Sequence, residues 1–211
     1  LGRPVGAPLW PEFFPAERNE RIRRQQTIKN GPAAFEALYQ QSPVVESGNY
    51  FKKHWIEPYM FPFGGQPQGL TVYMSSDYAV TAGGGNWTVH IVFGVDTRGH
   101  IWLLDLWRQQ ADPLEWCLAW VSLVLRWKPV RAAEEVGQIR KSVGPFLDRI
   151  ILQHRAFTAR SSADGDFVPS QDKAMRARSI AGRMQMGMVH VPSDAPWTAE
   201  LERELLDFRG A

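Results

Sequence analysis

The chain has 211 residues, 44% of them hydrophobic, and a formal net charge of +2. This composition predicts a soluble protein of one domain, or of one domain with an extension, because no apolar run could span a bilayer and no signal-peptide pattern is present. The single cysteine, Cys117, excludes an intrachain disulfide framework and a cysteine-based zinc site, and it suits a reducing compartment.

Residues 1–69 differ in character from the rest and predict an extension. Pro15–Gln26 reads as a polar, charged helix that Gly31 and Pro32 end, and residues 33–41 predict a second short helix. Proline, glycine and aromatic residues dominate from residue 42 to residue 69, which is typical of a linker. No Gly-x-x-x-x-Gly-Lys-Ser/Thr loop is present, so these residues give no sign of a nucleotide-triphosphate motor.

From Leu70 the pattern becomes regular and predicts a three-stranded antiparallel meander. Leu70–Ser76, Trp87–Val95 and His100–Trp107 are apolar runs rich in β-branched and aromatic residues. Three glycines separate the first two runs, and the tight turn Asp96–Gly99 separates the last two.

Helix–strand alternation follows the meander. Asp112 is a predicted helix N-cap, and Pro129 closes that helix before a strand over Val130–Glu135. A helix with the apolar stripe Ile139–Ile151 comes next, and Gly144 and Pro145 should kink or restart it. The remaining predicted elements are a short strand Phe157–Ser161, a helix Gln171–Met186 ended by Gly187, a strand Met188–Val191 and a helix Thr198–Phe208. The fold class is therefore α/β, a mixed sheet of three antiparallel and then parallel strands, flanked by helices.

Two of the predicted strands end in acids. Asp77 follows the first strand, and Glu134 with Glu135 ends the fourth. Carboxylates that converge from neighbouring strands can bind hard divalent cations, and two such ions support phosphodiester hydrolysis. Alternation sends Glu134 and Glu135 to opposite faces, so only one of them should enter the site. The alternative is that Asp77 caps a turn and both glutamates are solvated.

Other conspicuous residues read better as structure than as chemistry. Cys117 lies within an apolar helical pattern and predicts a buried side chain. The five histidines have no zinc-like spacing, and His90 and His190 lie within strands, where packing is the favoured interpretation. The tryptophans at helical spacing predict packing on the sheet rather than a carbohydrate-binding face; they are Trp116, Trp120 and Trp127.

Short motifs in a fixed order run through nearly the whole chain. They are Leu9-Trp-Pro-Glu, Phe35-Glu-Ala-Leu-Tyr-Gln-Gln-Ser-Pro, Tyr73-Met-Ser-Ser-Asp-Tyr-Ala-Val-Thr, the run from Trp87 to Gly99, Leu103-Leu-Asp-Leu-Trp-Arg, Glu135-Val-Gly-Gln-Ile, Asp172-Lys-Ala-Met-Arg-Ala-Arg, Gly187-Met-Val-His-Val-Pro, Ala195-Pro-Trp and Glu202-Arg-Glu-Leu-Leu-Asp-Phe. In order and spacing they resemble the nuclease domain of the bacteriophage terminase large subunit, a DNA-packaging protein whose nuclease has an RNase H-like, RuvC-type fold.

The resemblance implies a division of the chain and a set of metal ligands. Residues 1–69 resemble the linker that follows the family's ATPase domain, and residues 70–211 its nuclease domain. The family's first metal-binding acid corresponds to Asp77, and its fourth-strand acid to Glu135, with Glu134 as the alternate. Two Mg²⁺ or Mn²⁺ ions are the implied cofactors, and cleavage of concatemeric double-stranded DNA is the implied activity.

Two departures from the family pattern bear on this site. Many members have an aspartate where this chain has Asn86, which could alter an auxiliary ligand or the water network. The family's third acid lies in a helix after the Leu-Leu-x-Phe-x-x-Gly run, so we expect the third ligand beyond Ala211 and a chain truncated at its C-terminus. Asp207 lies upstream of the expected position, and Asp105 is interpreted as a structural partner of Arg108 or of a helix.

Basic residues suggest where DNA would be held. Residues 131–183 contain ten Lys and Arg against six Asp and Glu, a modest excess that an ordinary solvated surface would also show. The expected phosphate contacts are Arg140, Lys141, Lys173 and Arg176. Family resemblance adds the terminase small subunit and the portal as partners, and the cytoplasm of an infected or prophage-carrying bacterium as the location. The alternatives are a non-catalytic module that docks DNA or the portal, and another RNase H-like nuclease such as a junction resolvase.

Overall fold

The structure is a computed structural model that describes residues 10–30, 50–60, 68–79, 87–134, 138–160 and 173–209. The chain divides into two compact units. The first consists of Leu1–Glu57, Gln171–Met188 and Ala199–Ala211, and the second of Pro58–Ser170 and Val189–Thr198. Across the described ranges, no helix has the length and apolar character needed to cross a membrane.

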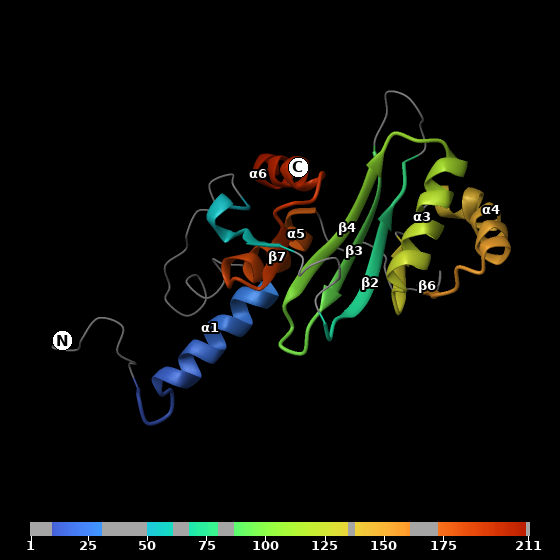
Figure 1. The fold of residues 1–211 in the computed structure, drawn as a ribbon. Coiled ribbons are helices and arrows are strands. Elements are labelled where there is room, and N and C mark those ends of the chain that lie inside the picture. Colours follow the sequence, from blue (N-terminus) through green and yellow to red (C-terminus); the bar gives the residue numbers. More distant parts are fainter. Residues whose placement is uncertain are drawn as a thin grey trace. The chain divides into compact units, whose positions relative to one another are not determined.

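A mixed seven-stranded sheet organises the second unit (Figure 1). Its strands are β1 (Glu57–Tyr59), β2 (Thr71–Asp77), β3 (Thr88–Val95), β4 (Ile101–Gln109), β5 (Arg131–Glu134), β6 (Ala159–Arg160) and β7 (Val189–Pro192), in the spatial order β1-β7-β4-β3-β2-β5-β6. The antiparallel meander β2-β3-β4 is confirmed. β5 runs parallel to β2, β6 parallel to β5, and β7 parallel to β4. The predicted α/β class is therefore confirmed, and the first and fourth predicted strands, β2 and β5, are neighbours in the sheet.

Helices α3 (Pro113–Trp127) and α4 (Gln138–His154) cover one face of this sheet (Figure 1). The predicted N-cap is confirmed, since the Asp112 carboxylate accepts from the backbone N–H groups of Leu114 and Glu115 and closes a capping box. Of the tryptophans predicted to pack on the sheet, Trp116 and Trp120 are buried and Trp127 is partly buried against the core. The core between helices and sheet contains Met74, Val92, Leu104, Trp116, Trp120, Ala132, Leu147 and Ile150.

Two features of the second unit differ from the sequence prediction. Glu57–Tyr59, expected within a linker, forms β1 at the end of the sheet, where Tyr59 accepts a hydrogen bond from the Ser193 backbone N–H at 2.8 Å. An end strand tolerates Pro58 because one side of it needs no backbone donor. In addition, α4 does not restart at Pro145 but continues as one helix. The turns after Pro145 bury Leu147 and Ile150 in the core, which offsets the loss of one backbone donor.

In the first unit, helices α1 (Ala16–Asn30) and α5 (Lys173–Gln185) lie against each other at very short range. A Cβ atom at Gly182 would come within 1.9 Å of the Thr27 carbonyl oxygen, so only glycine permits this approach. Gly187, at φ +64°, ends α5 as predicted. Residues of α6 (Thr198–Asp207) after Thr198 also belong to this unit. The predicted helix over residues 33–41 lies outside the described residues.

Candidate functional site

Asp77 is the last residue of β2, and its side chain is exposed. The neighbouring parallel strand β5 pairs with β2 up to Ser76, which lies opposite Glu134. Asp77 and Glu135 thus each follow in sequence the last pair of this ladder, Ser76 and Glu134. Glu135 itself lies outside the described residues. The register shows that the two chain segments carrying the predicted ligands reach the same end of the sheet.

Alternation along the strands separates the polar residues at this end into two sets. Ser76, His90 and Glu134 are buried, and register places them on the face that α3 and α4 cover, here called the helix-covered face. Asp77 pairs with Val89 on the opposite face, here called the Asp77 face. Residues adjacent in sequence therefore have opposite surroundings.

Glu134, the alternate metal ligand, is fully buried and already paired with a cation. The Arg160 guanidinium donates to both of its carboxylate oxygens, at 2.6 and 2.9 Å. Arg160 also donates to Asp148. Burial alone would lower the pKa of Arg160, but the hydrogen bond and charge of Glu134 outweigh this and raise it. For Glu134 to bind a metal ion, it would have to exchange Arg160 for that ion.

His90 fills the centre of the helix-covered face as a neutral side chain. Its Nε2 lies 3.0 Å from the Trp116 carbonyl oxygen, and its Nδ1 lies 2.9 Å from the Ser76 hydroxyl. Because a carbonyl only accepts, Nε2 carries the proton and Nδ1 accepts from Ser76. Burial lowers the pKa of His90 to about 4. Its ring stacks on Trp107, so the interpretation of His90 as a packed residue is confirmed.

Asp105 has the structural role that its sequence position indicated. Its carboxylate accepts from Trp127 Nε1 at 2.7 Å and from the Arg126 guanidinium at 3.3 Å, both on α3. These residues line an open hollow of about 1150 Å³ that also includes Leu70, at the start of β2. Asp77 ends the same strand, so the hollow lies at the other end of β2 from the candidate ligand.

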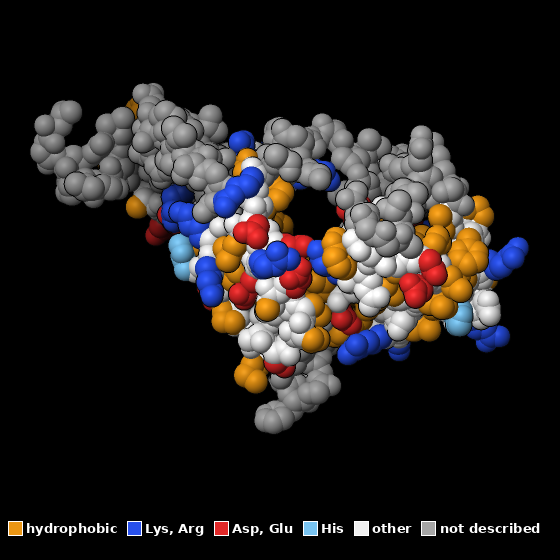
Figure 2. All heavy atoms as spheres, turned by 90° about the horizontal axis from the view of Figure 1, so that it is seen from above, with side chains coloured by type: hydrophobic (Ala, Val, Ile, Leu, Met, Phe, Trp, Pro, Cys, Tyr) orange, Lys and Arg blue, Asp and Glu red, His pale blue; other side chains and the backbone are white. Residues whose placement is uncertain are grey.

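The expected DNA contacts are only partly described. Arg140 and Lys141 lie in α4 and Lys173 begins α5, but their side chains are outside the described set. Arg176 is exposed on α5. On the face shown in Figure 2, acidic and basic side chains are interspersed rather than gathered by sign. Charge distribution alone therefore does not mark a DNA surface there.

Three further predictions concern side chains outside the Asp77 end of the sheet. Asp207 is exposed and lies 4.0 Å from Arg203 on α6, a surface ion pair within one helix. Cys117 is fully buried, and burial raises the pKa of its thiol to about 12, so its buried position is confirmed. His190 stacks on Trp102 with ring centroids 3.9 Å apart, in agreement with a packed role. Asn86 lies outside the described residues.

Sequence reasoning missed two clusters of polar side chains. One is the set formed by Glu134, Arg160 and Asp148, whose members come from β5, β6 and α4. The other joins His100 Nδ1 to His190 Nε2 at 2.9 Å, across 90 positions of sequence. Their spacing along the chain gave no signal, because the contacts arise only when β6 joins β5 and β7 joins β4. The pairing of parallel strands was the one feature that could have revealed them.

Within the described ranges, no three His, Cys, Asp or Glu side chains lie close enough together to hold a metal ion. Asp77 is the carboxylate exposed at the end of β2, and the oxygens of Glu134 are bound to Arg160. No model of a known protein family matches the chain, and no curated protein matches it either. The chemistry of the site therefore has to be argued from its own residues.

Proposed function

We propose that this chain carries the RNase H-like nuclease domain of a viral DNA-packaging terminase, which cuts concatemeric double-stranded DNA. The observation that carries the proposal is the parallel pairing of β2 with β5, which ends one residue before Asp77 and one residue before Glu135. Hard divalent cations bind oxygen ligands, and two acids at adjacent strand ends can supply them. The sheet adds support, because three antiparallel strands followed by parallel ones are what the sequence resemblance implies.

In this proposal Asp77 and Glu135 hold two Mg²⁺ or Mn²⁺ ions, and a third acid completes the site. Bound there, the ions would supply an activated water and neutralise charge on the leaving oxygen. The exposure of Asp77 fits this role, since its carboxylate is accessible to a cation and to a phosphodiester. Glu134 does not fit as well, because Arg160 already balances its charge inside the core. Duplex DNA is the proposed substrate, and the terminase small subunit and portal are the proposed protein partners.

The proposal is tested by Mn²⁺-dependent nicking of a supercoiled plasmid by the full-length protein. Asp77→Asn removes one negative charge and keeps the shape of the side chain, so we expect nicking to fall by at least about 100-fold. Asp207→Asn is the matched control, because Asp207 is an exposed carboxylate on α6. It should nick at the wild-type rate. Equal nicking by wild type and Asp77→Asn would overturn the proposal.

The pairing of Glu134 with Arg160 keeps a second function under consideration, a module that holds DNA or the portal without cleaving. If Glu134 rather than Glu135 corresponds to the family's fourth-strand metal ligand, its carboxylate is already paired with Arg160 in the core. Titration calorimetry of Mn²⁺ into the full-length protein distinguishes the two functions. Mn²⁺ binding that Asp77→Asn removes supports the nuclease. DNA affinity without Mn²⁺ binding supports the docking module.

A further inference from the structure

Arg108 and Asp77 belong to one row of directly paired residues that crosses three neighbouring strands. Asp77 of β2 pairs with Val89 of β3, and Val89 pairs with Arg108 of β4. Directly paired residues point to the same face of an antiparallel sheet, so the row places an acid and a base on the Asp77 face. Trp107, the residue before Arg108, contacts His90 on the helix-covered face, which agrees with this assignment.

Asp77 and Arg108 are close enough for both to contact phosphates of the same DNA strand. Each antiparallel step separates paired Cα atoms by about 5 Å, so the backbones at Asp77 and Arg108 are about 10 Å apart. Phosphates rise by about 3.4 Å per nucleotide along each strand of a duplex. A phosphate bound by Arg108 would therefore lie within about three nucleotides of one that reacts at Asp77.

The Arg108 guanidinium lies over the ring of Trp87. The carbon at the centre of the guanidinium lies 3.8 Å from the centroid of the Trp87 ring. Trp87 precedes β3 directly, two residues before Val89, and 44% of its surface is exposed. Stacking uses the flat face of a guanidinium, so the Trp87 ring constrains the plane in which the five N–H groups lie.

We propose that Arg108 is a phosphate-binding residue for duplex DNA and that Trp87 is the residue that positions it. This inference rests on the proposed nuclease function for the meaning of the Asp77 end of the sheet. A planar, oriented guanidinium binds a phosphate through two parallel hydrogen bonds, which a lysine does not reproduce. The contact is to the DNA backbone, so it sets the position of the duplex and reads no sequence.

The test is binding of a fluorescent 20-base-pair duplex to the full-length protein in EDTA, followed by anisotropy over a range of salt. Without metal no cleavage takes place, so the result does not depend on nuclease activity. We expect Arg108→Ala to weaken binding about tenfold near 50 mM salt, as the loss of a charged hydrogen bond would. The slope of log affinity against log salt should fall by about one.

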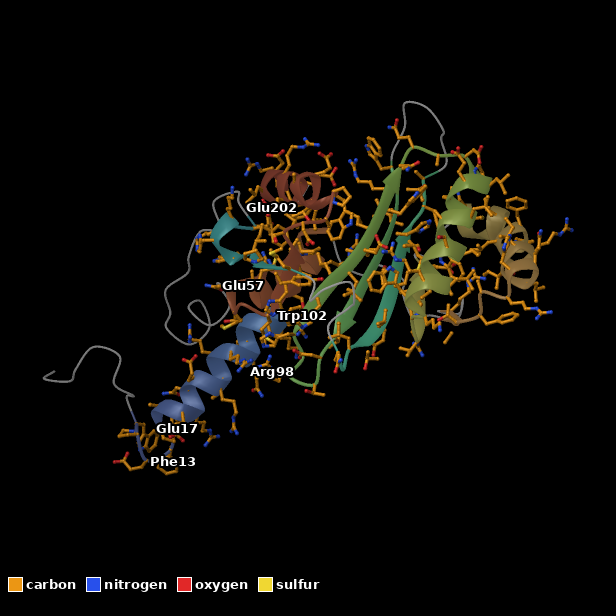
Figure 3. All side chains as sticks on the ribbon, in the orientation of Figure 1. Phe13, Glu17, Glu57, Arg98, Trp102 and Glu202 are labelled. Carbon is orange, nitrogen blue, oxygen red and sulfur yellow. The ribbon has the colours of Figure 1, made fainter. Side chains whose placement is uncertain are left out.

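The matched control is Arg98→Ala. Arg98 is an exposed arginine in the β3–β4 turn, at the other end of the same strands (Figure 3). It lies more than about 20 Å along β4 from Arg108. Arg98→Ala should leave both affinity and salt slope unchanged. Arg108→Lys keeps the charge, so it should retain most of the salt slope with lower affinity, and it serves in place of Arg108→Ala if that variant unfolds.

Trp87 is tested through its coupling to Arg108. Trp87→Ala should weaken binding in the wild-type background and have no further effect in the Arg108→Ala background. Trp87→Phe keeps an aromatic face and should retain most of the affinity. Wild-type affinity and salt slope in Arg108→Ala would overturn the inference, as would equal losses in Arg98→Ala. Either result leaves the nicking test of Asp77 to report separately on the proposed function.

Discussion

The two faces of the sheet at the end of β2 show how alternation divides a polar sequence. On the helix-covered face, Ser76 and His90 are hydrogen-bonded to each other and Glu134 is bound to Arg160, all in a closed interior. On the Asp77 face, the next residue along β2 is an exposed acid. A buried polar group must be satisfied internally, whereas an exposed one is available to a ligand. The comparison indicates that the first face stabilises the fold, and the second presents the acid to which we assign the proposed chemistry.

The largest expected effect on the helix-covered face is from Glu134→Gln. Removing the charge leaves Arg160 without its main partner beside the core, which should lower the free energy of unfolding by about 3 kcal/mol. Urea unfolding measures this loss. Glu20→Gln is the control, because Glu20 forms an exposed pair with Arg23 on α1 and should change stability by less than about 0.5 kcal/mol. A loss no larger than that of the control would contradict the structural role of Glu134.

An effect of similar size should come from His90 as pH falls. The pKa of His90 is about 4 in the folded protein, against 6.5 as its ordinary value, so between these values the unfolded chain binds a proton that the folded chain does not. Stability should therefore decrease from pH 6.5 to pH 4, by up to roughly 3 kcal/mol. Urea unfolding at several pH values measures the slope. His90→Gln should flatten it over this range, and an unchanged slope in that variant would show that other groups cause it.

The smallest effect compares two adjacent serines. Ser76→Ala removes the hydroxyl that donates to His90 and should cost about 1 kcal/mol of stability. Ser75 lies on the Asp77 face, where Ser75→Ala should be close to neutral. The two variants delete the same group from neighbouring positions, so their difference in urea midpoint reports on the faces alone. Equal midpoints would mean that the faces do not differ as described.

The strands and most of the helices could be predicted because they depend on local signals. Alternation around Val92, the capping sequence at Asp112 and the glycine after α5 are each contained in a few neighbouring residues. The neighbouring positions of β2 and β5 did not follow from local signals, because parallel pairing joins segments that are far apart in the chain. The strand Glu57–Tyr59 could not be predicted, because its partner β7 is more than 130 positions away in the chain.

The candidate site was only half accessible to sequence reasoning. Alternation predicted that the side chains of Glu134 and Glu135 would point to opposite faces of the sheet. The residues around Glu134 gave no signal that Arg160, on β6, would bind its carboxylate. The row that brings Arg108 level with Asp77 depends on strand register, which a bulge at Val92 and Phe93 shifts by one residue. Contacts that depend on register or on distant strands require the folded chain.

The most direct test of the division between the faces is the Mn²⁺-dependent nicking rate of full-length Glu135→Gln protein, measured beside its urea midpoint. Glu135 follows the buried Glu134 in sequence, and we propose that it holds the metal ions together with Asp77. We predict that nicking falls by at least about 100-fold while the midpoint stays at the wild-type value. Wild-type nicking by Glu135→Gln would contradict the assignment, and so would loss of nicking only through unfolding.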